Sequence, residues 1–311
     1  MSDAANRTEP ARLSRHLAAL GFVLPALLIY GLFVLYPLLT SLWGSLFEWR
    51  GLRQLDFSWF NNYLRLFTFP NSEKLFGALW HNVAWFFGIM LFQNGFGLIL
   101  AYLLFWSRKG ANFFQSVFFF PAVLSPVIVG ALWRLLLAPN GVVEWMLNGL
   151  GLHEGRLTVL GDSGWALWVL IAIDAWNWMG LPVLIFTAGL RQISYEVFEA
   201  AKLDGAGSTR MLTTVALPLL VPSISSVTTL SFINTFNQFD IVYVMQGVQG
   251  NPNFSTDTLV TYFYRLAFGA EGAVGITDIG LALALGTMLF LLLSVGTLLL
   301  LRAFDRATVQ P

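Results

Sequence analysis

Cysteine is absent from this 311-residue chain, and charged residues make up only 11% of it. The absence of cysteine excludes disulfide frameworks, thiol nucleophiles and cysteine-based metal sites. Soluble domains usually contain about 25% charged residues, so this chain lacks the polar surface needed to cover a water-exposed globule. Its formal net charge is zero, which gives no general attraction to nucleic acid.

Apolar residues dominate the composition. They account for 57% of the chain, and the mean hydropathy is +0.69. A membrane-spanning helix needs roughly 20 mostly apolar residues. Six stretches meet that requirement, at about 17–46, 77–106, 112–137, 165–190, 217–245 and 276–301. We therefore predict an all-α integral membrane protein with six transmembrane helices.

Basic residues outside the spans predict the orientation. Arg7, Arg12 and Arg15 precede the first span, and the short link after the second span carries Arg108 and Lys109. Cytoplasmic loops are rich in Lys and Arg, so both termini are expected in the cytoplasm. The first apolar run is far longer than a signal-peptide core and is expected to be retained. The predicted division is a cytoplasmic tail at 1–16, a transmembrane domain at 17–302 and a second cytoplasmic tail at 303–311.

The chain has no sequence features of an energy-converting or catalytic centre. It contains no GxxxxGK[ST] phosphate-binding loop, so ATP and Mg²⁺ would have to be bound by a separate subunit. His16, His81 and His153 are widely separated, without the spacing of metal ligands. No nucleophile and base are paired in a recognisable motif, so we expect a transport subunit without its own cofactor or metal rather than an enzyme.

A polar, glycine-punctuated segment at 194–218 separates the fourth and fifth spans on the predicted cytoplasmic side. Ser194 is placed to cap a short helix from Tyr195 to Leu203, and Gly205 suits the left-handed position that ends it. Ser208 can begin a second short helix that runs toward Leu217.

The same segment carries a family motif. Glu199-Ala200-Ala201, three residues, Gly205, nine residues and then Val215-Ala216-Leu217-Pro218 resembles the EAA motif of ABC importer permeases, with Val215 in place of Ile. In that family the segment forms a coupling helix that fits a groove on the ATPase. The resemblance implies contact with the ATPase through Glu199, Ala200, Ala201, Asp204 and Gly205.

Further motifs narrow the resemblance. LYPLLTSLWGSL at 35–46, the Asn62-Tyr63 pair and NTFNQFDIVYVM at 234–245 resemble the MalF-like permeases of carbohydrate importers of the maltose-transporter type. The usual GGP-type turn after the fifth span is replaced here by residues 247–252, and the large extra outer loop of the maltose protein is missing.

This resemblance implies an assembly and an activity. The chain would lie in the bacterial inner membrane with a second, homologous MalG-like permease, two ATPase subunits and an extracytoplasmic solute-binding protein. It would import a sugar or oligosaccharide by ATP-driven alternating access, in contact with lipid and not with nucleic acid.

Polar side chains inside the spans mark a candidate solute site. Such residues are costly in a membrane unless they face a cavity or one another. They are Gln93 and Asn94 in the second span, Asp174, Asn177 and Trp178 in the fourth, and Asn234, Asn237, Gln238 and Asp240 in the fifth. Hydrogen bonding between helices explains Gln93, Asn94 and Asp174 equally well. Ser231, Asn234 and Gln238 recur at helical spacing and share one face, which favours a cavity wall.

The family resemblance extends this set. It implies solute contacts at Trp176, Asn177, Met179, Gly180, Val183, Ser231, Asn234, Thr235 and Gln238. Asp174 and Asp240 are expected to act as a gate or at an interface.

Three alternatives stay open at this point. An importer of the same class can carry a polyol, a glycerophosphate or another small polar solute, although a phosphate group would require an Arg or Lys that the polar candidates lack. An ion-coupled secondary transporter can use Asp174 and Asp240 as a proton relay, and then uptake would be indifferent to ATP. A membrane enzyme is the third alternative, without a supporting motif.

Overall fold

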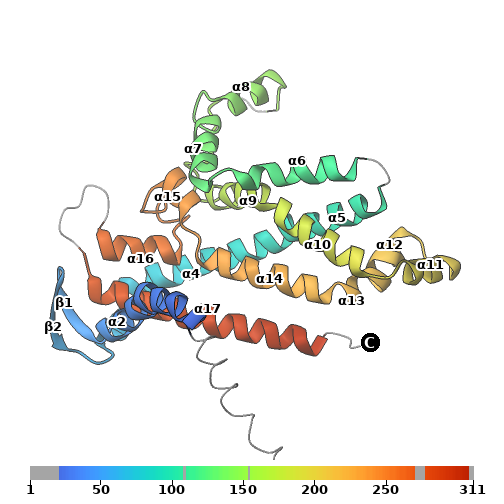
Figure 1. Ribbon diagram of the computed structural model, residues 1–311. Helices are drawn as coiled ribbons and strands as arrows, with labels where there is room; N and C mark the ends of the chain where they lie inside the picture. The colour runs from blue at the N-terminus through green and yellow to red at the C-terminus, as the bar shows by residue number, and fades with distance from the viewer. Residues whose placement is uncertain (1–20, 108–109, 153–154, 270–276, 308–311) are drawn as a thin grey trace, which may run out of the picture.

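The computed structural model describes residues 21–107, 110–152, 155–269 and 277–307 (Figure 1). The tail expected at 1–16, the Arg108-Lys109 pair and residues 308–311 of the second tail lie outside the described residues. The elements in chain order are η1 Gly31–Leu35, α2 Tyr36–Gly44, β1 Phe47–Arg50, β2 Arg53–Phe57, α3 Asn61–Leu66, α4 Asn71–Gly88, η2 Ile89–Gly95, α5 Phe96–Trp106, α6 Ala111–Val123, α7 Pro126–Leu136, α8 Val142–Gly149, α9 Ala166–Trp178, α10 Gly180–Gln192, α11 Tyr195–Leu203, α12 Ser208–Arg210, η3 Met211–Ala216, α13 Leu217–Leu219, α14 Val221–Phe236, α15 Asp240–Gln246, α16 Leu259–Phe268 and α17 Ile279–Ala307.

The fold is that of a mostly helical membrane protein. Three helices are long and apolar enough to cross a bilayer, over Gly21–Gly44, Asn71–Trp106 and Ile279–Arg306. Three bent helix pairs also qualify when each pair is taken as one span, which gives three to six candidate spans among the described residues. The pairs are Ala111–Val123 with Pro126–Leu136, Ala166–Trp178 with Gly180–Gln192, and Ser208–Leu219 with Val221–Phe236.

The third apolar stretch is bent rather than continuous. Its two helices meet at 91°, because Leu124 and Ser125 adopt extended backbone conformations and Pro126 begins the next helix. The residue before a proline is biased toward such conformations, so the turn follows from the sequence. Pro121 lies inside α6 as expected, whereas Pro126 starts α7, which packs against α15 and leads to the projecting helix α8 (Figure 1).

The fourth and fifth stretches bend as well. The fourth turns by 48° at Met179, between α9 and α10. The fifth turns by 75° at Leu220 and its helix α14 ends at Phe236. A separate short helix, α15, begins at Asp240, so the continuous span expected at 217–245 is interrupted twice.

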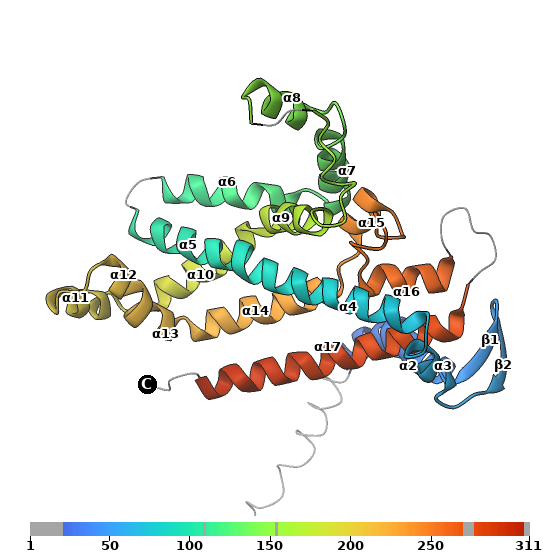
Figure 2. The ribbon, with the colours of Figure 1, turned by 180° about the vertical axis from the view of Figure 1, so that it is seen from behind.

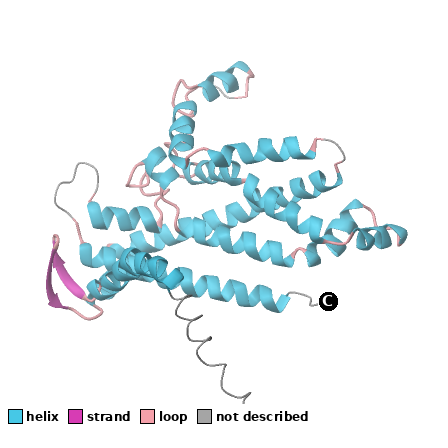
Figure 3. Cartoon of the chain, in the orientation of Figure 1, coloured by secondary structure: helices cyan, strands magenta, loops and turns pink. Residues whose placement is uncertain are grey.

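The residues between the first and second predicted spans fold into an antiparallel hairpin, a departure from the purely helical expectation (Figure 3). Phe47 in β1 pairs with Phe57 in β2, and Gly51 in the turn has φ of +57°. The rings of Phe47 and Phe57 lie 5.1 Å apart, and Trp43 contacts both. Aromatic cross-strand pairs of this kind stabilise small sheets.

Different segments of the chain lie at the two ends of the molecule. The hairpin lies at one end and the α11–α12 segment lies at the other, in both views (Figures 1 and 2). The long helices run between these ends. The segment at 194–218 and the hairpin are therefore on opposite sides of the helical region.

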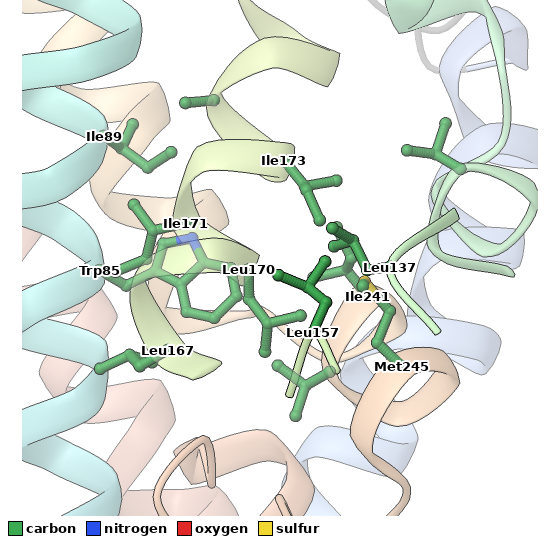
Figure 4. Packing of buried hydrophobic residues seen from close by; sticks show 13 residues of the cluster. Trp85, Ile89, Leu137, Leu157, Leu167, Leu170, Ile171, Ile173, Ile241 and Met245 are labelled. Atoms are coloured by element: carbon green, nitrogen blue, oxygen red, sulfur yellow. The ribbon is translucent and has the colours of Figure 1, made fainter. Parts of the chain in front are cut away.

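Three clusters of buried apolar residues hold the helices together. One surrounds Trp85 and joins α4 to α9 and α15 (Figure 4). A second joins α16 to α17, and a third joins α5 and α10 to α11. In the first helix, Gly21–Gly44, no residue of the most apolar 18-residue window is buried. The apolar side chains of this helix are therefore exposed, as suits contact with a bilayer.

Candidate functional site

A polar cavity of about 220 Å³ lies where the second, fourth and fifth helical stretches meet. Half of the residues that line it have polar or charged side chains, a high share for the interior of a membrane protein. The polar members are Gln93, Asp174, Ser231, Asn234, Thr235, Asn237, Gln238 and Asp240. The other wall residues include Ile89, Pro126, Trp178, Leu181, Pro182, Ile185, Val227 and Leu230.

The end of α14 supplies one wall of this cavity. Ser231, Asn234 and Thr235 lie on its last turns, and the helix stops at Phe236. The non-helical residues that follow, Asn237 and Gln238, also face the cavity. A helix end leaves backbone carbonyls without partners inside the helix, so other groups must satisfy them.

Two side chains outside the helix donate to carbonyls at this end of α14 and just after it. The Asn82 amide donates to the carbonyl of Thr235 at 2.7 Å and accepts from the backbone N–H of Leu259 at 2.9 Å. The Thr258 hydroxyl donates to the carbonyl of Gln238 at 2.8 Å and caps the start of α16. The interruption of the fifth stretch is thus fixed by hydrogen bonds from α4 and from the N-cap of α16.

The fourth stretch supplies a carboxylate and an apolar face. The indole Nε1 of Trp85 donates to Oδ2 of Asp174 at 2.8 Å, and the Gln238 side chain interacts with the same carboxylate. Trp178 and Pro182 continue the wall beyond the bend at Met179. An amide, a carboxylate and an indole therefore converge on one cavity.

The second stretch makes both a helix contact and a cavity contact. The Asn94 amide donates to the Ser231 hydroxyl at 2.8 Å, which joins η2 to α14. Its neighbour Gln93 lines the cavity. Both explanations offered for this pair by the sequence thus have a counterpart in the structure.

The cavity brings together six of the predicted site residues, Asp174, Ser231, Asn234, Thr235, Gln238 and Asp240. Five others lie outside its wall, and their role as solute contacts stays a prediction. Trp176 is exposed and packs its ring against Trp133 at 5.7 Å, while Asn177 is buried with its carbonyl oxygen unpaired. Met179 lies at the bend and Val183 is fully buried.

Gly180, the fifth of these, has a clear packing role. A side chain there would meet the carbonyl oxygen of Phe118 at 2.7 Å and the backbone nitrogen of Phe119 at 2.9 Å. Its lack of a side chain allows α10 to lie directly against α6.

Several residues that line the cavity were not among the predicted solute contacts. Trp178, Leu181 and Ile185 are spaced at three and four residues, so they share one face of the fourth stretch. The sequence does mark Asn237, Trp178 and Gln93 as polar or aromatic residues inside spans. Pro126 enters the wall only through the bend after Val123, which hydropathy alone does not reveal.

The segment between the fourth and fifth stretches adopts the expected local structure. The helix α11 covers Tyr195–Leu203 as predicted, and Gly205 follows it with φ of +76°. Ser194 is at the N-cap position, but its side chain makes no capping hydrogen bond. A continuous helical stretch from Ser208 to Leu219 then leads into α14.

One side of this segment is exposed, and the other side packs against the neighbouring helices. Glu199, Ala200, Asp204 and Gly205 are exposed, and Ala201 is half-buried. On the opposite side Phe198 is fully buried in the cluster that joins α11 to α5 and α10.

Two polar contacts add to this anchor. The ammonium of Lys202 lies 4.4 Å from the Trp106 ring, and the Tyr102 hydroxyl donates to the carbonyl of Ser208 at 3.0 Å. The exposed surface of the segment is thus firmly joined to the C-terminal end of α5.

Sequence comparison identifies relatives of this chain. The lactose transport system permease protein LacF of Rhizobium radiobacter is 34% identical over 248 residues, covering 79% of this chain and 82% of that protein. The multiple sugar-binding transport system permease protein MsmF of Streptococcus mutans is 29% identical over 279 residues, with 89% and 92% covered.

Structural comparison gives the same fold. The chain is similar, with a TM-score of 0.80 and 24% identity, to a chain in the crystal structure of a bacterial ABC transporter involved in the import of the acidic polysaccharide alginate. The match covers 96% of this chain and 99% of that one.

The family model described as "Binding-protein-dependent transport system inner membrane component" matches residues 93–310. That range contains the fourth and fifth stretches, the segment at 194–218 and most of the cavity wall. This chain therefore belongs to the inner-membrane components of binding-protein-dependent transport systems, and it is an ABC transporter permease subunit rather than an enzyme.

Proposed function

We propose that this permease passes a sugar or oligosaccharide from an extracytoplasmic binding protein into the cytoplasm by alternating access. The observation that carries the proposal is the cavity, where amides, hydroxyls and carboxylates line one wall and Trp178 lies among apolar residues. Sugar hydroxyls need hydrogen-bonding partners, and the C–H faces of sugar rings pack on aromatic surfaces. The names of the relatives, a lactose permease and a multiple sugar permease, support the same class of solute.

The proposed topology has six spans and both termini in the cytoplasm. Each bent helix pair then contributes one crossing, in the third pair through α14, and the three continuous helices are the others. The transmembrane domain would extend over 17–302. The placement of the segment at 194–218 opposite the hairpin supports this topology, because three crossings lie between these two regions and an odd number puts them on different sides (Figure 1).

The segment at 194–218 is proposed to dock on an ATPase. Its exposed residues Glu199, Ala200, Asp204 and Gly205 would meet the partner, with Ala201 beside them. Its buried Phe198 and the Lys202–Trp106 contact would pass a displacement on to α5. ATP-driven closure of two ATPases would then rock the attached helices as rigid bodies.

The proposed assembly contains a second, homologous permease, two ATPase subunits and the binding protein. ATP and Mg²⁺ would be bound by the ATPases. In this arrangement the exposed apolar faces of the first helix, α6 and α7 are available to lipid or to the second permease.

Replacement of both Asn234 and Gln238 by alanine tests the proposed site. A thermal-shift screen of sugars and polyols against the cognate binding protein first identifies a solute, which is then radiolabelled. In proteoliposomes that contain the complete importer, we expect the double variant to lower ATP-driven uptake at limiting solute by tenfold or more, roughly the effect of two lost hydrogen bonds.

The matched control is Asn112→Ala, an exposed amide on α6 outside the cavity wall. Uptake in this variant should equal that of the unchanged importer. Undiminished uptake in the double variant would refute the site. Uptake that needs an ion gradient and ignores ATP would instead favour a secondary transporter.

A further inference from the structure

We propose that the cavity selects against anionic solutes through Asp174 and Asp240, so that the transported saccharide is uncharged or bears an amino group. This inference rests on the proposed function, because it concerns the solute that enters the same cavity. It excludes sugars that carry carboxylate or phosphate groups, a distinction that neither the fold nor the relatives' names provide.

The first step is the charge content of the wall. Asp174 comes from the fourth stretch and Asp240 from the first position of α15, and both line the one cavity. Among the described residues that line this cavity there is no Lys, Arg or His. The wall therefore contributes acidic groups without any basic group.

The second step is the absence of a compensating partner. In the described part of the chain, ion pairs join Arg65 to Asp278 and Arg265 to Asp257, and neither includes a cavity carboxylate. The contacts of Asp174 are the indole of Trp85 and the amide of Gln238, which are both neutral. Neutral donors stabilise a carboxylate without cancelling its charge for other ions.

The third step is the consequence for a solute. Charges interact more strongly in a protein cavity than in water, because the effective dielectric constant is lower. A carboxylated or phosphorylated sugar would be repelled by both acidic groups. The hydroxyl groups of a neutral sugar can donate hydrogen bonds to these carboxylates, and an ammonium group would be attracted.

Asp240 also has an ordinary local role. A carboxylate at the first position of a helix interacts favourably with the backbone N–H groups there. Asparagine can still serve at a helix start, so Asp240→Asn removes the charge while keeping the local structure.

The absence of cysteine from the chain permits a direct test. Asn234→Cys places a single thiol on the cavity wall, and Asn112→Cys places one on the exposed surface of α6. The complete importer in lipid nanodiscs is treated with a trimethylammonium-ethyl or a sulfonatoethyl methanethiosulfonate. In each reaction the thiolate attacks the sulfenyl sulfur, forms a mixed disulfide and releases methanesulfinate. Intact mass of this chain gives both rates.

We expect the ratio of the cationic to the anionic rate to be roughly tenfold or more higher at Asn234→Cys than at Asn112→Cys. Adding Asp174→Asn and Asp240→Asn should bring the two ratios to within about twofold of each other. Equal ratios before those replacements would overturn the proposal, as would a large ratio that persists after them. A thiol at position 234 that reacts with neither reagent would also overturn it, because the cavity would then be closed to solutes.

Failure of this test can be told apart from failure of the proposed function. If the rate ratios are equal while Asn234 and Gln238 still matter for sugar uptake, only the charge selection is wrong. If uptake is indifferent to those two residues, the site itself is wrong.

Discussion

Trp85 and Asp174, which lie 89 positions apart in the sequence, are joined by a hydrogen bond of 2.8 Å from the indole Nε1 to the carboxylate Oδ2. Trp85 is fully buried in the cluster that packs α4 against α9 (Figure 4). Asp174, in contrast, lines the cavity. The bond thus connects the apolar core directly to the polar site.

Replacement of Trp85 by phenylalanine should destabilise the protein by about 1–3 kcal/mol, because a partly buried carboxylate loses its donor and the smaller ring leaves space. Thermal unfolding of the purified protein in detergent measures the effect. The control is Trp80→Phe in the same helix, since Trp80 is 67% exposed. Equal unfolding temperatures for the two variants would contradict a role for this hydrogen bond.

Replacement of Gly180 by alanine should separate α10 from α6. The added Cβ would lie 2.7 Å from the carbonyl oxygen of Phe118, and main-chain atoms cannot rotate away. We expect a loss of about 1–3 kcal/mol of stability in the same unfolding assay. Gly77→Ala is the matched control, because its Cβ would meet nothing within 4 Å and alanine favours a helix by up to about 1 kcal/mol. Similar stability in the two variants would show that the close approach of α6 is unimportant.

Replacement of Gly205 by valine should uncouple transport from ATP hydrolysis while the protein still inserts into the membrane. Gly205 has φ of +76°, a conformation that a β-branched residue resists, so the turn after α11 would have to change. The ratio of solute transported to ATP hydrolysed, measured in proteoliposomes, should fall severalfold. Gly207→Val is the control, because Gly207 has φ of −72° and open space around it. If the Gly205 variant keeps the normal ratio, the proposed coupling role is wrong.

Two ion pairs in the outer region should differ in their contribution to stability. Arg265 contacts Asp257 at 2.5 and 3.2 Å, and their side chains are only 11% and 2% exposed. Replacement of Arg265 by glutamine should cost about 3–5 kcal/mol, because Asp257 would remain buried and charged. The pair of Arg65 and Asp278 is 43% and 29% exposed, so Arg65→Gln should cost at most about 1 kcal/mol. Urea or thermal unfolding in detergent compares the two, and a larger loss for the Arg65 variant would contradict this ranking.

The sequence predicted the helical elements because the bilayer imposes a strong and simple requirement on them. Long apolar runs indicate spanning helices. In the polar segment at 194–218, Ser194 indicated the start of the short helix and Gly205 indicated the turn that follows it. The bends were less visible. Hydropathy does not distinguish a straight span from a helix that turns by 91° at Ser125, even though Pro126 provided the local cause.

The hairpin of the first outer loop was missed because its strands are short and mixed in character. Phe47 and Trp49 alternate with Glu48 and Arg50, which is a strand pattern, but four residues are too few to separate it from an interfacial loop. The candidate site was found in part. Periodicity located the wall on α14, whereas the contribution of Gln93 and Pro126 depends on how distant helices pack.

The hydroxyl of Thr258 makes two hydrogen bonds that join neighbouring segments. It accepts from the backbone N–H of Thr261, which caps α16, and it donates to the carbonyl of Gln238. Asn82 makes the same kind of double attachment from α4, to Thr235 and to Leu259. The start of α16 and the cavity wall are consequently joined by hydrogen bonds on both sides of the interruption. A displacement of α16 would therefore alter the width of the cavity without any contact with the residues that line it.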